Sequence, residues 1–153
     1  VVVTAEGPFA ATLRSEAGIR KLENLLLLPY QPAVDYPDML ATADVLMSVL
    51  NPDASIYSVP SKVYAYMCAA RPQLLSISAD NPAAKLISVH QMGLVSTPGD
   101  LDAWLGNARA LYQNRYNNSQ MGINARAYAE ENFDIERITD AFESIMQQSL
   151  KGS

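Results

Sequence analysis

Short apolar segments alternate with segments of helical period along most of this chain, and this alternation restricts the possible folds more than any other feature. Between the apolar segments, apolar side chains recur at helical spacing after short connections. Strands that alternate with helices require right-handed crossovers, which make the strands parallel. The sequence therefore predicts an α/β fold in which helices cover both faces of a parallel sheet. The predicted strands are residues 1–4, 24–28, 45–50, 73–77 and 93–95.

A run of helices without intervening strands is expected after the fifth strand. In the first of these helices, Trp104 belongs to an apolar stripe and is expected in the core. Asp134 is expected to cap the last helix. The tail at residues 151–153 is expected to be frayed. The apolar residues of the last helix that we expect to face inward are Ile138, Ala141, Phe142 and Ile145.

The composition is typical of a globular domain. Of the 153 residues, 49% are hydrophobic and 18% are charged, so residues 1–153 are expected to form one domain. The formal net charge of −5 provides no overall attraction for nucleic acid or an anionic membrane. The single cysteine, Cys68, cannot form an internal disulfide and is expected to be a buried, inert thiol, which fits a cytoplasmic protein. Because the chain starts at Val1 inside an apolar run, we expect it to be a fragment of a longer protein.

Residues 58–62, with the sequence Ser-Val-Pro-Ser-Lys, are expected to turn from a loop into a helix. Ser58 is expected to cap the first N–H groups, and Pro60 to lie in the first turn. The helix start then presents backbone N–H groups, two hydroxyls and the Lys62 ammonium group, which together suit a phosphate. An ordinary cap that binds only water is the alternative. The apolar residues of this helix that we expect to pack inward are Val63, Tyr66, Met67 and Ala70.

Other candidate positions lie where the predicted strands end, because ligands bind outside the carboxyl ends of parallel strands. Gly7 follows the first strand, where a simple turn is favoured because the other glycines of a dinucleotide-binding loop are absent. Tyr30 follows the second strand and either stacks on a base or covers an edge of the core. His90, the only histidine, has no Cys or acidic neighbour at ligand spacing, so no metal site is predicted.

Several short motifs, taken in order, resemble the carboxyl-terminal domain of family-four glycosyltransferases, which are retaining enzymes built from two Rossmann-like domains. The resemblance extends over nearly the whole chain, and the order and spacing of the motifs are more specific than any one of them. The motifs are Ala-Glu-Gly-Pro at 5–8, Leu-Ala-Thr-Ala-Asp-Val at 40–45, Val-Pro-Ser-Lys at 59–62, Tyr-Met at 66–67, Arg-Pro at 71–72, Gly-Leu-Val at 93–95, Pro-Gly-Asp at 98–100, Ala-Arg-Ala-Tyr at 125–128 and Asn-Phe at 132–133.

The resemblance implies a Rossmann-like domain that binds a nucleotide-sugar donor, which is a substrate, so that neither a cofactor nor a metal is implied. Lys62 would be the catalytic group, since a lysine and fixed N–H groups stabilise the charge that grows on the leaving nucleoside diphosphate. Residues 58–62 would line the diphosphate, residues 30–32 would lie near the base, and Gly7 would border the pocket. The implied donor-binding residues are Gly7, Tyr30, Gln31, Pro32, Ser58, Val59, Pro60, Ser61 and Lys62.

The implied enzyme is a retaining glycosyltransferase that transfers a sugar to a glycan or lipid-linked acceptor, in the assembly of polysaccharide or another glycoconjugate. This chain would lack the first strand and helix of the donor domain and the whole amino-terminal acceptor domain. The chain alone is therefore expected to be inactive. The full-length parent is expected in the cytoplasm, with the missing domain as its contact to a membrane surface and with no nucleic acid as a partner.

Two positions depart from the family pattern. Family members carry a glutamate at Ala65, where it contacts the donor ribose, and a glycine at Ala70, so this helix must end in another cap or a strained residue. A non-catalytic Rossmann-like interaction module with a degenerate donor site is therefore one alternative. A related sugar-nucleotide enzyme, such as a two-domain epimerase, is another, although no histidine–carboxylate constellation supports it. Fold alone does not decide among these functions.

Overall fold

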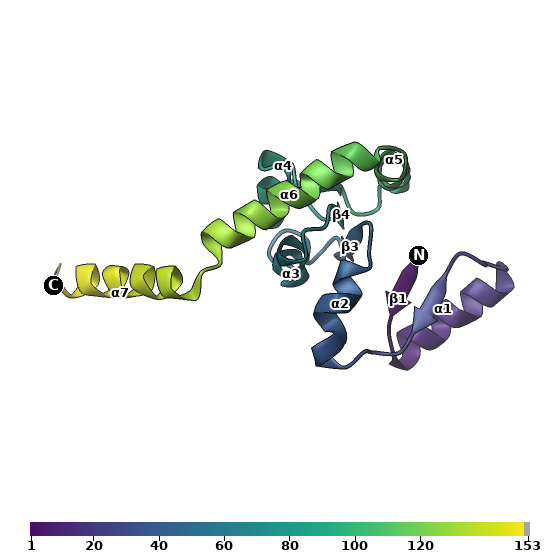
Figure 1. The fold of residues 1–153 in the computed structure, drawn as a ribbon. Helices are drawn as coiled ribbons and strands as arrows, with labels where there is room; N and C mark the ends of the chain where they lie inside the picture. The colour runs from purple at the N-terminus through teal and green to yellow at the C-terminus, as the bar shows by residue number, and fades with distance from the viewer. Residues whose placement is uncertain (152–153) are drawn as a thin grey trace. The chain divides into compact units, whose positions relative to one another are not determined.

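The structure is a computed structural model that describes residues 1–151, apart from the side chains of 115–117, 150 and 151. The chain folds into two compact units, residues 1–39 and the residues from 40 on, and each is described by itself (Figure 1). Of the tail predicted to be frayed, residues 152 and 153 lie outside the described residues.

The first unit contains one parallel pair of strands and a helix that connects them. Val3 lies opposite Leu27 in the pair, so the register is in step along both strands. The chain then makes a 3-10 turn and enters a helix that begins in this unit and ends in the second. The elements are β1 (Val2–Thr4), α1 (Gly7–Ile19), β2 (Leu26–Leu28), η1 (Ala33–Asp35) and α2 (Tyr36–Ala41).

The second unit alternates strands with helices and ends in three consecutive helices. Its central strand has a parallel neighbour on each side, and Ser48, Leu75 and Val95 lie side by side across the sheet. All five predicted strands are present and each has a parallel partner, which confirms the Rossmann-like α/β fold. After α2 the elements are β3 (Leu46–Val49), α3 (Lys62–Cys68), β4 (Gln73–Ser76), α4 (Pro82–Val89), β5 (Gly93–Ser96), α5 (Leu101–Gln113), α6 (Arg115–Asn132) and α7 (Ile135–Lys151).

Helices cover both faces of the three-stranded sheet. Successive residues of β4 point to opposite faces of the sheet, so Leu74 and Leu75 belong to different clusters. Leu74 packs with Leu111 of α5 and Met121 of α6, and the predicted core residue Trp104 packs against this cluster. Leu75 faces a larger cluster on the other side. Its fully buried large members are Val63, Met67, Leu75, Ile77, Ile87 and Met92. The inward-facing residues predicted for α3 are thus confirmed for Val63 and Met67, and Tyr66 is buried as well.

Side chains and one glycine of α6 hold the ends of the earlier helices. Arg126 donates from Nη1 to the Cys68 carbonyl oxygen at 2.8 Å, and Asn124 donates from Nδ2 to the Gln91 carbonyl oxygen at 3.2 Å. A Cβ atom at Gly122 would lie 2.4 Å from the Ala70 carbonyl oxygen, so only glycine fits where α6 passes the end of α3. Residues 122–126 of α6 therefore fix the ends of α3 and α4.

Two predictions about burial are wrong. Cys68 is exposed, because it is the last residue of α3 and lies outside the apolar face that Val63 and Met67 form. No described side chain of α7 is buried, and Phe142 and Ile145 are 61% and 60% exposed. An amphipathic pattern identifies the apolar face of a helix but not the surface that covers it, so the pattern alone does not place this face in the core.

None of the helices in the described part of the chain combines the length and the apolar character that crossing a membrane requires.

Three helices end in the same turn, each with a non-glycine residue in the left-handed region. Lys21 follows α1, Ala70 follows α3 and Gln91 follows α4, with φ values of 52°, 55° and 51°. At the end of α3, the Ala70 N–H donates to the Met67 carbonyl oxygen at 3.0 Å and the Arg71 N–H donates to the Tyr66 carbonyl oxygen at 3.3 Å. These two bonds define a Schellman motif, in which glycine is the usual residue. Of the two helix ends expected at Ala70, another cap or a strained residue, the structure shows the strained residue.

We expect Ala70→Gly to stabilise the chain by about 1 kcal/mol, because glycine adopts the left-handed conformation without the steric cost that alanine has there. The melting temperature should rise by roughly 2–4 °C. Ala69→Gly is the matched control, since Ala69 has a φ of −76° and gains nothing from glycine. Thermal denaturation of both variants checks this. A loss of stability in Ala70→Gly equal to that in Ala69→Gly would show that no strain is stored at this position.

Candidate functional site

The loop of residues 51–61 connects the carboxyl end of β3 to α3 and contains most of the predicted diphosphate site. Its own turns close it: the Ala54 N–H donates to the Asn51 carbonyl oxygen at 3.0 Å, and the Ser58 N–H donates to the Ala54 carbonyl oxygen at 2.9 Å. Ser55 is buried inside the loop, and its hydroxyl donates to the Pro52 carbonyl oxygen at 2.8 Å. The loop is therefore compact, and its last residues place positions 58–62 at the edge of the sheet.

The start of α3 differs from the prediction. The helix begins at Lys62, and Ser61 is its N-cap residue but makes no capping hydrogen bond through its side chain. Pro60 is buried and lies before the helix, where its carbonyl oxygen accepts from the Val63 N–H at 3.0 Å. The predicted Ser58 cap and the first-turn position of Pro60 are therefore wrong. The first turn closes on the Pro60 carbonyl, so no hydroxyl is required there.

Ser61 and Lys62 nevertheless present the polar groups of an anion site. Both residues are exposed, and within the described part of the chain Lys62 makes no ion pair. The N–H groups of Ser61 and Lys62 have no acceptor among the described residues. Behind them, the Tyr66 hydroxyl donates to the Met47 carbonyl oxygen at 3.1 Å, which fixes α3 to β3. The Lys62 ammonium group and the N–H groups of Ser61 and Lys62 therefore lie at the start of a helix whose position on β3 is fixed.

Asn81, which the sequence predicts only as the start of a helix, connects this loop to the next one. Its Oδ1 accepts from the Ala83 N–H at 2.8 Å and caps α4. Its Nδ2 donates to the carbonyl oxygens of Ser55 at 2.7 Å and Ser58 at 3.0 Å. The Asn81 side chain is fully buried. Asparagine before Pro82 predicts the helix cap. Only the structure shows that Nδ2 of the same side chain binds the segment before Lys62.

The other predicted residues lie together in the first unit. Gly7 begins α1 with a φ of +75°. The adjacent Glu6 accepts from the Tyr30 N–H at 3.1 Å, so the loops after β1 and β2 are tied to each other. Tyr30 is 64% exposed, and Gln31 donates from Nε2 to the carbonyl oxygen of its own loop at Pro29. Pro32, the last predicted residue of this group, precedes η1 as its N-cap residue. The Glu6 carboxylate places a negative charge beside Gly7.

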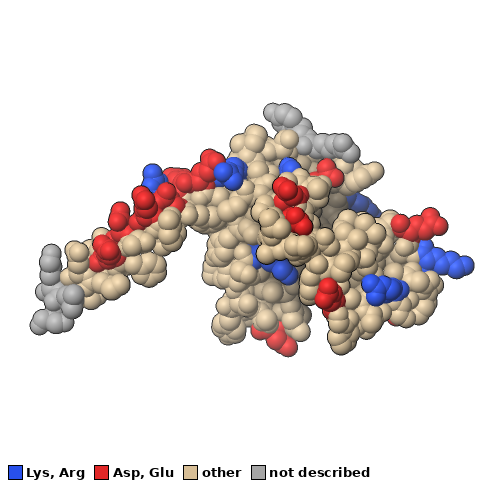
Figure 2. Space-filling view, turned by 60° about the horizontal axis from the view of Figure 1, so that its bottom comes forward, with Lys and Arg blue, Asp and Glu red and all other residues tan. Residues whose placement is uncertain are grey.

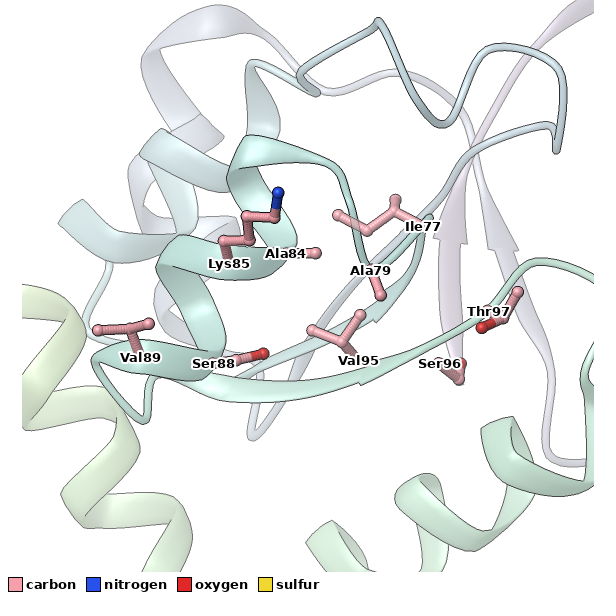
Figure 3. Close-up of a pocket in the computed structure, with 9 residues that line it drawn as sticks. All are labelled: Ile77, Ala79, Ala84, Lys85, Ser88, Val89, Val95, Ser96 and Thr97. Carbon is pink, nitrogen blue, oxygen red and sulfur yellow. The ribbon is translucent and has the colours of Figure 1, made fainter.

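A hollow of about 380 Å³ lies between α4 and the carboxyl ends of β4 and β5 (Figure 3). Its walls are mostly small or apolar, and they include Ala84 of α4 and Val95 of β5. Lys85 stands at its rim and lies 3.9 Å from Asp80, so its charge is balanced. The hollow contains none of the predicted donor-binding residues. It therefore belongs to a different part of the sheet edge from the loop at Lys62.

Charged side chains of both signs are scattered over the face shown in Figure 2, with wide neutral areas between them. No broad basic surface is visible on that face, which agrees with the formal net charge of −5. Among residues 1–151, wherever side chains are described, no group of three or more His, Cys, Asp or Glu residues is placed to hold a metal ion. His90 is exposed.

The fold and this loop define a Rossmann-like domain with a candidate anion site at the end of β3. No family model matches the sequence, and the comparison with curated proteins finds no match. The fold matches the crystal structure of Anabaena Alr3699/HepE in complex with UDP, with a TM-score of 0.74 and 17% sequence identity. The match covers 92% of this chain and 37% of that chain, so this chain spans little more than a third of the length of HepE.

Proposed function

We propose that this chain binds the nucleoside diphosphate part of a nucleotide-sugar and is the donor-binding part of a glycosyltransferase. The observation that carries the proposal is the match to HepE over 92% of this chain, because that protein was solved in complex with UDP. A shared fold directs attention to the same edge of the sheet, since ligands in such folds bind at the carboxyl ends of the strands. Among the described residues at that edge, Lys62 is an exposed lysine that makes no ion pair.

The proposed chemistry follows from the groups at the end of β3. The N–H groups of Ser61 and Lys62 and the Lys62 ammonium group would bind the diphosphate. They would also stabilise the negative charge that develops on it when the sugar leaves. Such groups act without a metal ion. In the proposed parent protein, the sugar passes with retention of configuration to a glycan or lipid-linked acceptor bound by a further domain.

The proposed setting is polysaccharide or glycoconjugate assembly at the cytoplasmic side of a membrane, which the parent protein would contact through another domain. A non-catalytic interaction module is the second candidate. It is favoured by Ala65, whose methyl group cannot accept the hydrogen bond that the resemblance assigns to a glutamate at this position. Both candidates keep the fold, and they differ in whether a nucleotide binds.

Calorimetric titration of the chain with UDP, GDP, ADP and inorganic diphosphate tests the proposal. We expect at least one nucleoside diphosphate to bind more tightly than inorganic diphosphate, because the base and ribose add contacts to those of the phosphates. If no nucleotide binds even at millimolar concentration, the donor-binding proposal is wrong and the interaction module is the better interpretation. Binding of inorganic diphosphate alone would support only an anion site.

A further inference from the structure

The connection between α6 and α7 carries an aromatic ring that contacts α3. Phe133 lies in this connection, and its ring centroid is 5.5 Å from that of Tyr64, with the two ring planes at 84°. This separation and angle are typical of the edge-to-face arrangement that aromatic pairs prefer. Phe133 is half-buried and also packs against the larger core cluster. A residue beyond the end of α6 thus contacts the helix that begins at Lys62.

The position of Phe133 is fixed by α6 and by the start of α7. Its N–H donates to the Ala129 carbonyl oxygen at 2.9 Å, which continues the hydrogen bonding of α6. The next residue, Asp134, accepts through its carboxylate from an N–H group in the first turn of α7 at 3.0 Å. The ring of Tyr128 in α6 lies 5.9 Å from that of Phe133, at 77°. Tyr64 therefore packs against a ring whose place is set outside α3.

Tyr64 belongs to the turn that carries the groups of the candidate anion site. Its N–H donates to the Ser61 carbonyl oxygen at 3.2 Å, and this bond helps to close the first turn of α3. Residues three apart in a helix are neighbours on one face, and helical side chains are tilted towards the helix start. Tyr64 is therefore on the same face as Ser61 and is tilted towards the end of the helix that presents the Lys62 ammonium group.

The start of α3 depends on contacts with other elements. The helix has seven residues, and its N-cap residue, Ser61, makes no capping hydrogen bond through its side chain. Isolated helices shorter than about 12–15 residues are marginal in water, and most helical stability in proteins comes from tertiary packing. Val63 and Met67 provide this packing on the inner face. On the exposed side of the first turn, the Phe133 ring packs against Tyr64.

We propose that Phe133 is a positioning residue for the diphosphate site, because it holds the Tyr64 ring and with it the turn that presents the N–H groups of Ser61 and Lys62. The inference rests on the proposed function and names a side chain that acts on that site without touching the ligand. Binding groups that are fixed in advance need not be ordered when the ligand arrives, so fixing them raises the affinity. A ring that only covers the edge of the core is the alternative. It would change the melting temperature but not the affinity.

Calorimetric titration of the Phe133→Ala chain with UDP and with inorganic diphosphate tests the proposal. The strength of an edge-to-face pair corresponds to about a twofold to tenfold change in an equilibrium constant, and we expect UDP affinity to fall by a factor in this range. Inorganic diphosphate should lose the same factor, because the displaced groups bind phosphates. Phe133→Tyr keeps the ring and should restore the affinity. Phe142→Ala is the matched control, since Phe142 is 61% exposed on α7, and it should bind UDP as wild type does.

Tyr64→Ala removes the other ring of the pair from an exposed position, so it tests the proposal even if Phe133→Ala does not fold, which circular dichroism would show. We expect the same loss of UDP affinity as in Phe133→Ala. The double variant should lose no more than either single variant, because all three lack the same contact. Tyr112→Ala is the control for Tyr64→Ala, since Tyr112 is 83% exposed on α5, and it should leave the affinity unchanged.

A folded Phe133→Ala chain that binds UDP as tightly as wild type would overturn the proposal, even with a lower melting temperature. Losses that add up in the double variant would contradict it as well, because Tyr64 would then act independently of Phe133. A loss for UDP but not for inorganic diphosphate would place the effect at the nucleoside and refute a role at the phosphates. A wild-type chain that binds no nucleotide would instead refute the proposed function, and this inference with it.

Discussion

Lys62→Ala is expected to weaken the binding of UDP by about tenfold to a hundredfold. A hydrogen bond to a charged group contributes about 1.5–3 kcal/mol, and each 1.4 kcal/mol corresponds to a tenfold change in affinity. The Lys62 ammonium group has no partner in the described chain that competes with a phosphate. Because Lys62 is exposed, its replacement should leave the melting temperature unchanged, so a loss of affinity reports on the site itself. Isothermal calorimetry measures the change.

Lys85→Ala is the matched control, because it removes the same charge from another exposed position. Lys85 lies at the rim of the hollow between α4 and β5, beside Asp80. We expect UDP to bind this variant as it binds wild type. The reverse result, in which Lys85→Ala loses affinity and Lys62→Ala does not, would place the nucleotide in the hollow of Figure 3. It would show that the site proposed at the end of β3 is wrong.

Asn81→Ala is expected to lower the free energy of unfolding by about 2–3 kcal/mol, which is roughly 5–10 °C in melting temperature. One part of the loss is the α4 cap, which is the hydrogen bond from the Ala83 N–H. The other part is the unsatisfied carbonyl oxygen of Ser55, a buried residue, together with that of Ser58. Because residues 55–58 precede Lys62, UDP affinity should fall as well, although Asn81 would not touch the ligand.

Asn81→Ser separates the two functions of this side chain. Serine can cap α4 but cannot reach the carbonyl oxygens in the preceding loop. We expect its stability to lie between those of Asn81→Ala and wild type, with a UDP affinity as low as that of Asn81→Ala. Thermal denaturation and calorimetry of the three proteins provide the comparison. If Asn81→Ser matches wild type in both measurements, the bonds to the loop contribute nothing and the residue is only a cap.

Much of the fold could be predicted because hydrophobic patterns act locally. Residues 73–77 contain three large apolar side chains, Leu74, Leu75 and Ile77, and most of this segment forms β4, the central strand of the larger sheet. The helical spacing of Val63, Tyr66 and Met67 indicated the inner face of α3. The pairing of the strands into a two-stranded and a three-stranded sheet could not be predicted, since pairing depends on contacts between distant segments.

The candidate site was predicted as a segment but not as a structure. The sequence Ser-Val-Pro-Ser-Lys indicated where polar groups would gather, yet it suggested a hydroxyl cap at Ser58. In the structure, Pro60 is buried and its carbonyl closes the first turn instead. The function of Asn81 depends on residues 23 and 26 positions away in the chain, and no local pattern records such a partnership. The nucleotide, its base and the sugar stay predictions.

The left-handed residue Gln91 at the end of α4 has a consequence for cooperativity. After Gln91 at the end of α4, the Met92 N–H donates to the Ile87 carbonyl oxygen and ends the helix. The Met92 carbonyl oxygen accepts from the Gln73 N–H, which is the first hydrogen bond in the pairing of β4 with β5. One residue thus completes a helix and starts a strand. The last turn of α4 cannot unwind without loosening the edge of the sheet, so helix and strand open together as a single unit.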